Sequence, residues 1–317
     1  MTTKKAPGKS FRKGITMLEL AEQFPDEESA RVWFEQKIWE DGRCCPRCKG
    51  QNTVESSHAQ MPYWCSDCRK YFSVRTGTLL ESSKVSLRKW VWAIYLHLTS
   101  LKGVSSMKLH RDIGVSQPTA WYMLQRIRKA FEDDDEPPFD GPVELDESYF
   151  GGKEGNKHES KKLNAGRGTV GKTPVVGAKD RPTNKVKAQV IDTADKATLQ
   201  AFVADSVAYG ATLYTDGASA YNRVGTLFNG IQHESVNHGV GEYVRNMAHT
   251  NGLESFWAML KRGYQGTYHW MSRKHLHRYI AEFAGRHGIR PLDTTDQMAA
   301  VARGMMGKRL MYKDLIV

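Results

Sequence analysis

The stretch from His249 to Arg262 combines an acid and a lysine at a spacing that could serve one reactive site. Its apolar residues recur at the interval of one helix face; they are Leu253, Phe256, Trp257 and Leu260. On such a helix, Glu254 and Lys261 project within about 20° of each other. A carboxylate in this position can hold a metal ion, and the ammonium group beside it can hold a phosphate oxygen.

Asn251, one turn before Glu254, allows a second interpretation of the same stretch. An Asn at the N-cap with a Glu three residues later is close to a capping box. Both side chains would then only bind backbone N–H groups, and Lys261 would be a solvated surface charge. The rest of the chain favours the reactive site, because it supplies two further carboxylates in suitable places.

Two aspartates follow short apolar runs and are expected at strand ends. Asp146 comes after residues 141–145, and Asp216 comes after residues 211–215. Glu144 and Glu147 flank the first of these aspartates and are weaker candidates. An ordinary turn aspartate at the end of a strand is the alternative for both Asp146 and Asp216.

Three carboxylates with gaps between them suit Mg²⁺, which prefers oxygen ligands and keeps part of its water. Two such ions about 3.5–4 Å apart can activate an attacking oxygen and stabilise the leaving oxygen during displacement at phosphorus. Asp146, Asp216 and Glu254 therefore predict a nuclease-like phosphoryl-transfer site, with Lys261 at the phosphate.

Four of the five cysteines form two Cys-x-x-Cys pairs, and sixteen residues separate the pairs. This spacing is typical of a zinc ribbon, in which two tight turns aim four sulfurs at one ion. The predicted zinc ligands are Cys45, Cys48, Cys65 and Cys68. Cys44 lies beside the first pair, but Cys-x-x-Cys geometry favours Cys45. Four unrelated buried thiols are the alternative, and the zinc could be purely structural.

Residues 86–131 predict three helices, the last two in a helix-turn-helix layout. A short helix over 105–113 ends at Gly114, and a second helix starts after Ser116 with proline in its first turn. In that motif the start of the second helix faces base edges. The expected DNA-binding residues are then Gln117, Thr119, Tyr122 and Arg126, to which we add Lys261 and Arg262. Any helical hairpin would give a similar pattern.

The composition favours a nucleic-acid partner. The formal net charge is +11 and the pI is about 9.3, so a polyanion is expected. No run of about 18 apolar residues is present, so no transmembrane helix is expected. The basic start has no apolar segment behind it, so no signal peptide is expected either. We therefore expect a cytoplasmic, nucleoid-associated protein that binds double-stranded DNA.

Composition shifts divide the chain into several parts. Residues 26–40 predict a helix with Val32, Trp33 and Ile38 as its apolar positions. Strands are expected at 174–179, 185–192, 212–216 and 231–236, and helices at 196–207, 251–261 and 273–287. The fold class is multidomain α/β. The expected divisions are 1–42 (basic lead and helix), 43–80 (zinc ribbon), 84–132 (helix-turn-helix), 133–140 (acidic linker), 141–290 (catalytic domain) and 291–317 (tail).

The motifs together resemble the IS1595-type (ISXO2-like) bacterial insertion-sequence transposases. The resemblance runs from about Phe24 to Tyr279 and is carried by the cysteine pairs, the helix-turn-helix and the segments 146–152, 214–217, 249–257 and 261–263. It implies a ribonuclease-H-like catalytic domain of the DDE class. That class uses Mg²⁺ (or Mn²⁺) to nick transposon ends and join the 3′-OH to target DNA, and its partners are the terminal inverted repeats and the target.

By the same resemblance, Asp146 and Asp216 are the first and second acids. The family is described with Asn, His or Glu at the third position, together with a Lys. Asn251 matches the Asn form, whereas Glu254 matches the acid-then-Lys spacing to Lys261. Glu254 is preferred because an amide oxygen is a neutral and weaker Mg²⁺ ligand.

Two other functions remain open at the level of the sequence. One is a zinc-ribbon and helix-turn-helix DNA-binding regulator with an inactive catalytic domain. The other is a nuclease without strand transfer. Two transposon ends suggest a homo-oligomer on DNA.

Overall fold

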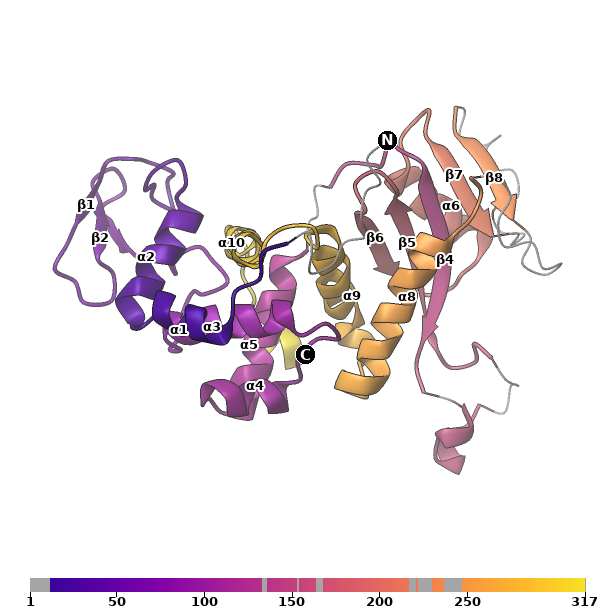
Figure 1. Ribbon diagram of the computed structural model, residues 1–317, viewed down its shortest axis with the longest axis horizontal. Helices are drawn as coiled ribbons and strands as arrows, with labels where there is room; N and C mark the ends of the chain where they lie inside the picture. Colours follow the sequence, from indigo (N-terminus) through magenta and orange to yellow (C-terminus); the bar gives the residue numbers. More distant parts are fainter. Residues whose placement is uncertain are drawn as a thin grey trace. The chain divides into compact units, whose positions relative to one another are not determined.

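The computed structural model describes residues 12–132, 136–152, 154–163, 168–216, 221, 230–236 and 247–316 (Figure 1). The chain forms two compact units. Unit 1 is made of Met1–Glu132 and Ile289–Val317, and unit 2 is Asp133–Gly288. Among the described helices, none is long and apolar enough to span a membrane.

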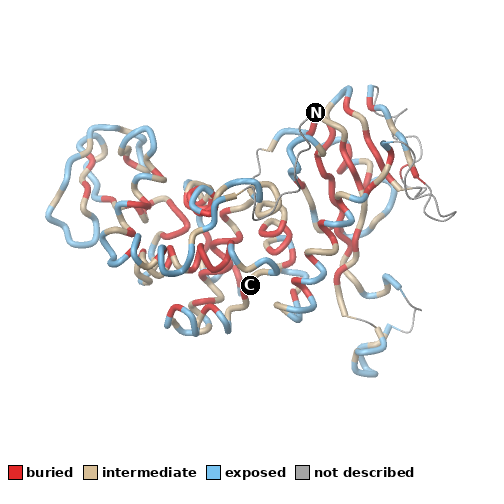
Figure 2. The backbone as a smooth tube through the Cα atoms, viewed as in Figure 1, coloured by how far each residue is buried: buried red, intermediate tan, exposed pale blue. Residues whose placement is uncertain are grey.

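Unit 1 is a helical body with a small sheet. Its helices are α1 (Met17–Gln23), α2 (Glu27–Ile38), α3 (Leu87–Thr99), α4 (Ser106–Ile113), α5 (Gln117–Ala130), α10 (Thr294–Gly304) and α11 (Lys313–Ile316). They share one apolar core, in which Trp90, Leu109 and Met123 are almost completely buried. In Figure 2 the buried residues of these helices are coloured red.

The three helices predicted over residues 86–131 are present, and their starts are set by serine caps. In each case the serine side chain accepts the backbone N–H of the residue three positions ahead. The pairs are Ser86–Lys89, Ser105–Lys108 and Ser116–Thr119. Gly114 ends α4 with a φ of 61°, a left-handed conformation that glycine adopts without strain.

Two expectations for unit 1 are wrong. Val32 is 39% exposed, and Phe34 takes the core position instead, so the apolar face of α2 was displaced in the prediction. Residues 291–317 are not a tail, because α10 packs into the core of unit 1. Its buried side chains recur at i, i+3, i+4 and i+7, which is a readable helix pattern; they are Met298, Val301, Ala302 and Met305.

The sheet of unit 1 has three short antiparallel strands. They are β1 (Thr53–Glu55), β2 (Tyr63–Cys65) and β3 (Lys70–Phe72), in the order β1-β2-β3. The aromatic residues on either side of the second cysteine pair therefore lie on strands: Tyr63 and Trp64 on β2, and Tyr71 and Phe72 on β3. The rings of Tyr63 and Phe72 lie 5.6 Å apart, and Trp39 packs edge-on against both.

Unit 2 contains a mixed five-stranded sheet. Its strands are β4 (Val143–Phe150), β5 (Thr173–Asp180), β6 (Val186–Val190), β7 (Thr212–Asp216) and β8 (Gln232–Val236), in the order β6-β5-β4-β7-β8. Strands β4, β7 and β8 run parallel to one another, β5 pairs antiparallel with β4, and β6 pairs antiparallel with β5. The strands predicted from the sequence are all present.

Helices cover both faces of this sheet (Figure 1). Helix α6 (Lys196–Ser206) packs on the face that carries Leu145 and Leu213. Helices α8 (Asn251–Gly263) and α9 (Arg273–Gly288), with a π-helical turn at Tyr264–Tyr268 between them, pack on the opposite face. Short 3₁₀ turns lie at Glu154–Asn156 and Glu159–Lys161, between β4 and β5.

The predicted acidic linker at 133–140 is only partly covered by the structure. Residues 133–135 lie outside the described residues. Phe139 is buried in the core of unit 2 and pairs with Val207 in an isolated bridge. The last part of this segment therefore belongs to unit 2.

Candidate functional site

Asp146 and Asp216 lie side by side on neighbouring parallel strands. The register of β4 and β7 pairs Leu145 with Thr215, so the two aspartates follow as the next residues of each strand. Side chains alternate between the two faces of a sheet, and neighbouring strands are about 4.8 Å apart. Both carboxylates therefore project from the same face, which is the face opposite to that of Leu145.

Helix α8 lies over this same face and is able to approach it closely. Gly177 of β5 is the register partner of Asp146. A Cβ atom at Gly177 would lie 2.8 Å from Cζ2 of Trp257 and 3.3 Å from Leu253, so only glycine leaves room for these side chains of α8. Glu254 lies between Leu253 and Trp257 in the sequence, so the same helix brings it near Asp146 and Asp216.

The charges of Asp216 and Glu254 both act on the Asp146 carboxyl. The pKa of Asp146 is raised to about 6, first by burial and then by the negative charges of Asp216 and Glu254. The backbone N–H of Glu147 and the nearby indole of Trp257 act in the opposite direction. That indole nitrogen is buried and makes no hydrogen bond of ordinary geometry, so its effect is a weak one. Charge repulsion of this kind is relieved when a cation binds.

The three carboxylates are nevertheless less tightly gathered than the cysteines. Across the described residues, the group of metal-capable side chains whose ligand atoms all lie within 4.8 Å of one another is the four cysteines. Glu254 is exposed on the first turn of α8, so its rotamer is not fixed by packing. The charges of the other two carboxylates thus reach Asp146, but the three carboxyl groups do not converge on one point as the four thiols do.

Glu147 belongs to the other face of the sheet. Burial, followed by the charges of Asp146 and Asp216, raises the pKa of Glu147 to about 8. The hydroxyl of Tyr221, itself buried in the core under α6, donates to the Glu147 carboxyl. Glu147 is therefore mostly protonated at neutral pH and adds little negative charge beside the two aspartates.

Glu144 has a positioning role that the sequence analysis missed. It is 1% exposed and lies on the same face as Asp146. Its Oε2 accepts the backbone N–H of Leu253 at 2.8 Å, and its Oε1 accepts Nε of Arg181 at 2.8 Å. Arg181 also donates to the backbone carbonyl of His249 at 2.7 Å. A buried ion pair thus fixes the start of α8, and with it the helix that carries Glu254.

A signal for this arrangement is present in the sequence. Residues two apart on a strand share a face, so Glu144 must accompany Asp146. Lys179, near the end of the partner strand, is the register partner of Glu144, and Arg181 directly follows that strand. A buried carboxylate needs such partners.

The capping-box interpretation of Asn251 is wrong. The N-cap of α8 is Thr250, which makes no side-chain capping bond, and Asn251 is the first helical residue, with an exposed side chain. The hydroxyl of Thr250 instead donates to the Glu254 carboxylate at 3.1 Å. Lys261 and Arg262 are exposed in the last turn of the helix.

The four predicted zinc ligands form one group. Sγ of Cys45 lies 3.6 Å from Sγ of Cys68, and Sγ of Cys48 lies 3.6 Å from Sγ of Cys65. Four sulfurs at 2.3 Å from one tetrahedral ion would be about 3.8 Å apart. The observed spacing therefore fits a metal ion of this kind, and Cys44 is outside the group.

The pKa of the Cys45 thiol is lowered, which favours the form that binds metal. Burial raises its pKa, but the backbone N–H groups of Cys48 and Arg47 lower it, and the net pKa is about 7. A thiolate is the form that binds metal.

The expected DNA-binding residues of unit 1 lie on α5. Gln117 donates from its amide to the hydroxyl of Ser106 at 2.8 Å, and Thr119 is half-buried in the first turn. Tyr122 donates to the carbonyl of Leu310 at 2.7 Å. Arg126 is 6% exposed, and its guanidinium stacks 4.3 Å from the centre of the Tyr122 ring.

Two comparisons with known proteins relate the chain to transposable elements. Residues 138–287 match the family described as ISXO2-like transposase domain. The chain is 31% identical over 276 residues to an "Uncharacterized protein in transposable element ISH50" of Halobacterium salinarum, over 84% of this chain and 92% of that protein. A chain of the "CryoEM structure of simian T-cell lymphotropic virus intasome in complex with PP2A regulatory subunit B56 gamma" has a TM-score of 0.29 at 12% identity, covering 60% of this chain and 66% of that one. A TM-score this low supports no argument.

Proposed function

The chain belongs to the IS1595-type, ISXO2-like transposase family, and we propose that it nicks the ends of a transposon and joins the 3′-OH to target DNA. The observation that carries this proposal is that Asp146, in the middle of β4, lies beside Asp216, the last residue of the neighbouring parallel strand β7, on the face covered by α8. The mixed sheet with helices on both faces supports a ribonuclease-H-like catalytic domain.

Asp146 and Asp216 would hold Mg²⁺ or Mn²⁺ through their carboxyl oxygens. The ion, when bound, supplies Lewis acidity to the phosphodiester and lowers the pKa of a ligated water or hydroxyl. Burial of Asp146 excludes bulk water from one side of the pair and strengthens its attraction for a cation. Glu147, whose carboxyl accepts a hydrogen bond from Tyr221, stays largely neutral on the opposite face of β4.

Glu254 is the preferred third ligand. Its charge already acts on Asp146, and a carboxylate binds a hard cation more strongly than an amide does. Asn251 is exposed on the same first turn of α8 and is the alternative. Lys261, two turns further along, would hold a phosphate oxygen of the DNA, with Arg262 beside it.

Unit 1 would supply DNA recognition. Cys45, Cys48, Cys65 and Cys68 would hold one structural Zn²⁺, which a small module of this kind needs in order to fold. The start of α5 would present Gln117 and Thr119 to base edges of the inverted repeat. The other partner is the target duplex, in a homo-oligomer that brings two transposon ends together on chromosomal DNA.

Two alternatives are separated from the proposal by one experiment. Purified protein is incubated with a labelled inverted-repeat duplex, an unlabelled target plasmid and Mg²⁺. Cut and joined products support a transposase, cutting alone indicates a nuclease, and a shifted but intact duplex indicates a DNA-binding regulator.

Variants test the site in the same assay. Asp216→Ala is expected to abolish cutting and joining while it leaves duplex binding intact. Asp205→Ala, which removes a 67% exposed carboxylate on α6, is the matched control and is expected to retain activity. Joining by Asp216→Ala would overturn the assignment. Glu254→Gln and Asn251→Ala, compared in parallel, identify the third ligand by the loss of Mg²⁺-dependent cutting.

A further inference from the structure

A groove of about 590 Å³ in unit 1 runs between the segment before α3 and the exposed side of α5. The side chains that line it are cationic, hydroxylic or apolar, and none of them is acidic. The cations are Lys84, Lys89 and Arg126, and the hydroxyls include those of Ser116, Thr119 and Tyr122. This composition favours an anionic ligand with several oxygen atoms.

Arg126 is the unusual member of this lining. It is 6% exposed, yet the polar contacts that the structure describes for it are all with Tyr122. Nη2 donates a 2.7 Å hydrogen bond to the Tyr122 hydroxyl, and the guanidinium stacks on the ring. Its Nε is buried without a hydrogen-bond partner. Among the described residues no carboxylate pairs with it. A buried, uncompensated guanidinium is unfavourable by itself, which indicates that an anion completes the site.

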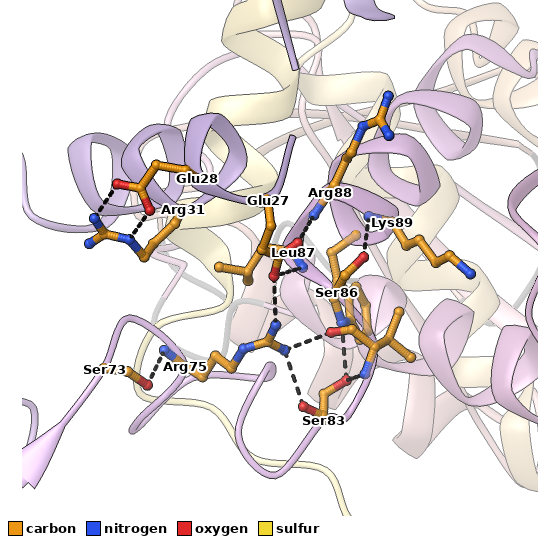
Figure 3. Close-up of polar contacts among 12 residues, drawn as sticks. Glu27, Glu28, Arg31, Ser73, Arg75, Ser83, Ser86, Leu87, Arg88 and Lys89 are labelled. Atoms are coloured by element: carbon orange, nitrogen blue, oxygen red, sulfur yellow. Dashed lines mark hydrogen bonds and ion pairs between the residues drawn. The ribbon is translucent and has the colours of Figure 1, made fainter. Parts of the chain in front are cut away.

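The carboxylate of Glu27, which binds the start of α3 beside the groove, is already occupied. Glu27 of α2 accepts the backbone N–H groups of Leu87 and Arg88 at 2.7 and 3.0 Å and pairs with Arg75 (Figure 3). Figure 3 shows the Lys89 side chain pointing away from this carboxylate; its Nζ donates to the carbonyl of Gly114 at 2.8 Å. The positive charges of the groove are therefore not neutralised by Glu27.

We propose that this groove binds a backbone phosphate of duplex DNA, with Arg126 as the central cation and Lys84 and Lys89 at its rim. The inference rests on the proposed function in one respect, the identity of DNA as the partner. The groove includes Ser116 and Thr119 at the start of α5, the part of the helix expected to face base edges. Backbone phosphates flank the groove that such a helix enters, so a phosphate pocket beside α5 would fix the register of the helix on DNA.

The test is a titration of full-length, zinc-loaded protein with a fluorescein-labelled duplex, without Mg²⁺, over a range of salt concentrations. Arg126→Gln is expected to weaken binding about tenfold and to reduce the slope of log affinity against log salt by about one. Arg126→Lys keeps the charge and is expected to restore most of the slope. Lys102→Gln, an exposed position beyond the far end of α3, is the matched control and should match the wild type.

An unchanged affinity and slope for Arg126→Gln, in a variant with a native circular dichroism spectrum, would overturn the proposal. If Arg126→Gln does not fold, Lys84→Gln decides, because Lys84 is exposed and its substitution should not affect folding. A reduced slope in that variant supports the groove, and a wild-type slope rejects it.

The titration needs no catalysis, so it is independent of the test of transposition. A protein that binds DNA through the groove but never cuts it would contradict the proposed function alone. A protein that cuts and joins DNA with an unaltered salt slope in the groove variants would contradict the groove alone.

Discussion

The carboxylate of Glu144 on β4 accepts the backbone N–H of Leu253, in the first turn of α8, at 2.8 Å. This bond crosses from the centre of the sheet to the start of the helix that carries Glu254. Both sides of the carboxylate are used, because Arg181 binds its other oxygen. The distance between the two aspartates of the sheet and Glu254 of the helix is therefore set by a residue that has no expected contact with DNA or metal.

Glu144→Ala is expected to reduce cleavage strongly and duplex binding little. The substitution removes the buried carboxylate that pairs with Arg181, and breaking such a pair destabilises a protein by about 3–5 kcal/mol. Urea denaturation followed by the fluorescence of Trp257 and its neighbours would measure this loss. Glu144→Gln should recover part of the stability, since an amide oxygen can still accept from Leu253. The control is Glu159→Ala at an exposed carboxylate; equal stability loss in both variants would contradict the role of Glu144.

In the presence of a chelator, unit 2 is expected to lose stability as the pH rises from about 4 to 8. The pKa of Asp146 rises to about 6 and that of Glu147 to about 8 in the folded protein, whereas their ordinary values are 3.8 and 4.5. The folded state thus holds more protons than the unfolded state in this window, so deprotonation favours unfolding. For Asp146 alone the effect is about 2–3 kcal/mol.

Thermal melts at pH 5 and pH 8 would check this expectation. Asp146→Asn and Glu147→Gln should each raise the melting temperature at pH 8 and flatten the pH dependence. Mg²⁺ should stabilise the wild type at pH 8 but not Asp146→Asn. A wild-type melting temperature that increases from pH 5 to pH 8 in chelator would show that these carboxyls are not destabilised by burial.

Removal of zinc is expected to unfold residues 45–68 while unit 2 keeps its structure. The three strands of this segment are short, and its small core is built from the cysteines and a few aromatic rings. Metal analysis should find one zinc per chain, and a strong chelator should abolish the near-ultraviolet dichroism of Trp64 and Tyr63. Cys48→Ser should lose zinc, whereas Cys44→Ser should retain it, because Cys44 lies outside the sulfur group. Retention of zinc by Cys48→Ser would reject the four-sulfur site.

The features that were readable from the sequence are those fixed by local physics. Serine caps set the starts of α3, α4 and α5, and Asp216 is the last residue of β7, as predicted. The prediction that Asp146 ends a strand is wrong, because β4 continues to Phe150 in its antiparallel pairing with β5. The role of Glu144 depends on a hydrogen bond to a residue 109 positions away, which no local pattern encodes. Helix α10 was missed although its periodicity was present, because its partners in the core lie in the first half of the chain.

Gly177→Ala tests whether close packing of α8 on the sheet matters to the site. A methyl group at this position would lie 2.8 Å from Trp257, and the ring belongs to a packed core that includes Phe256. Overpacking of this kind destabilises a protein by about 1–3 kcal/mol, and relief requires α8 to move away from Asp146. We expect Mg²⁺-dependent cutting to fall more than stability does, because a displacement of about 1 Å can reduce a rate about a hundredfold. Gly155→Ala is the control, since a Cβ there meets nothing within 4 Å. The double variant Gly177→Ala with Trp257→Phe should recover cutting, because the smaller ring makes room for the added methyl group. A double variant that stays inactive would show that the contact between β5 and α8 does not position Glu254.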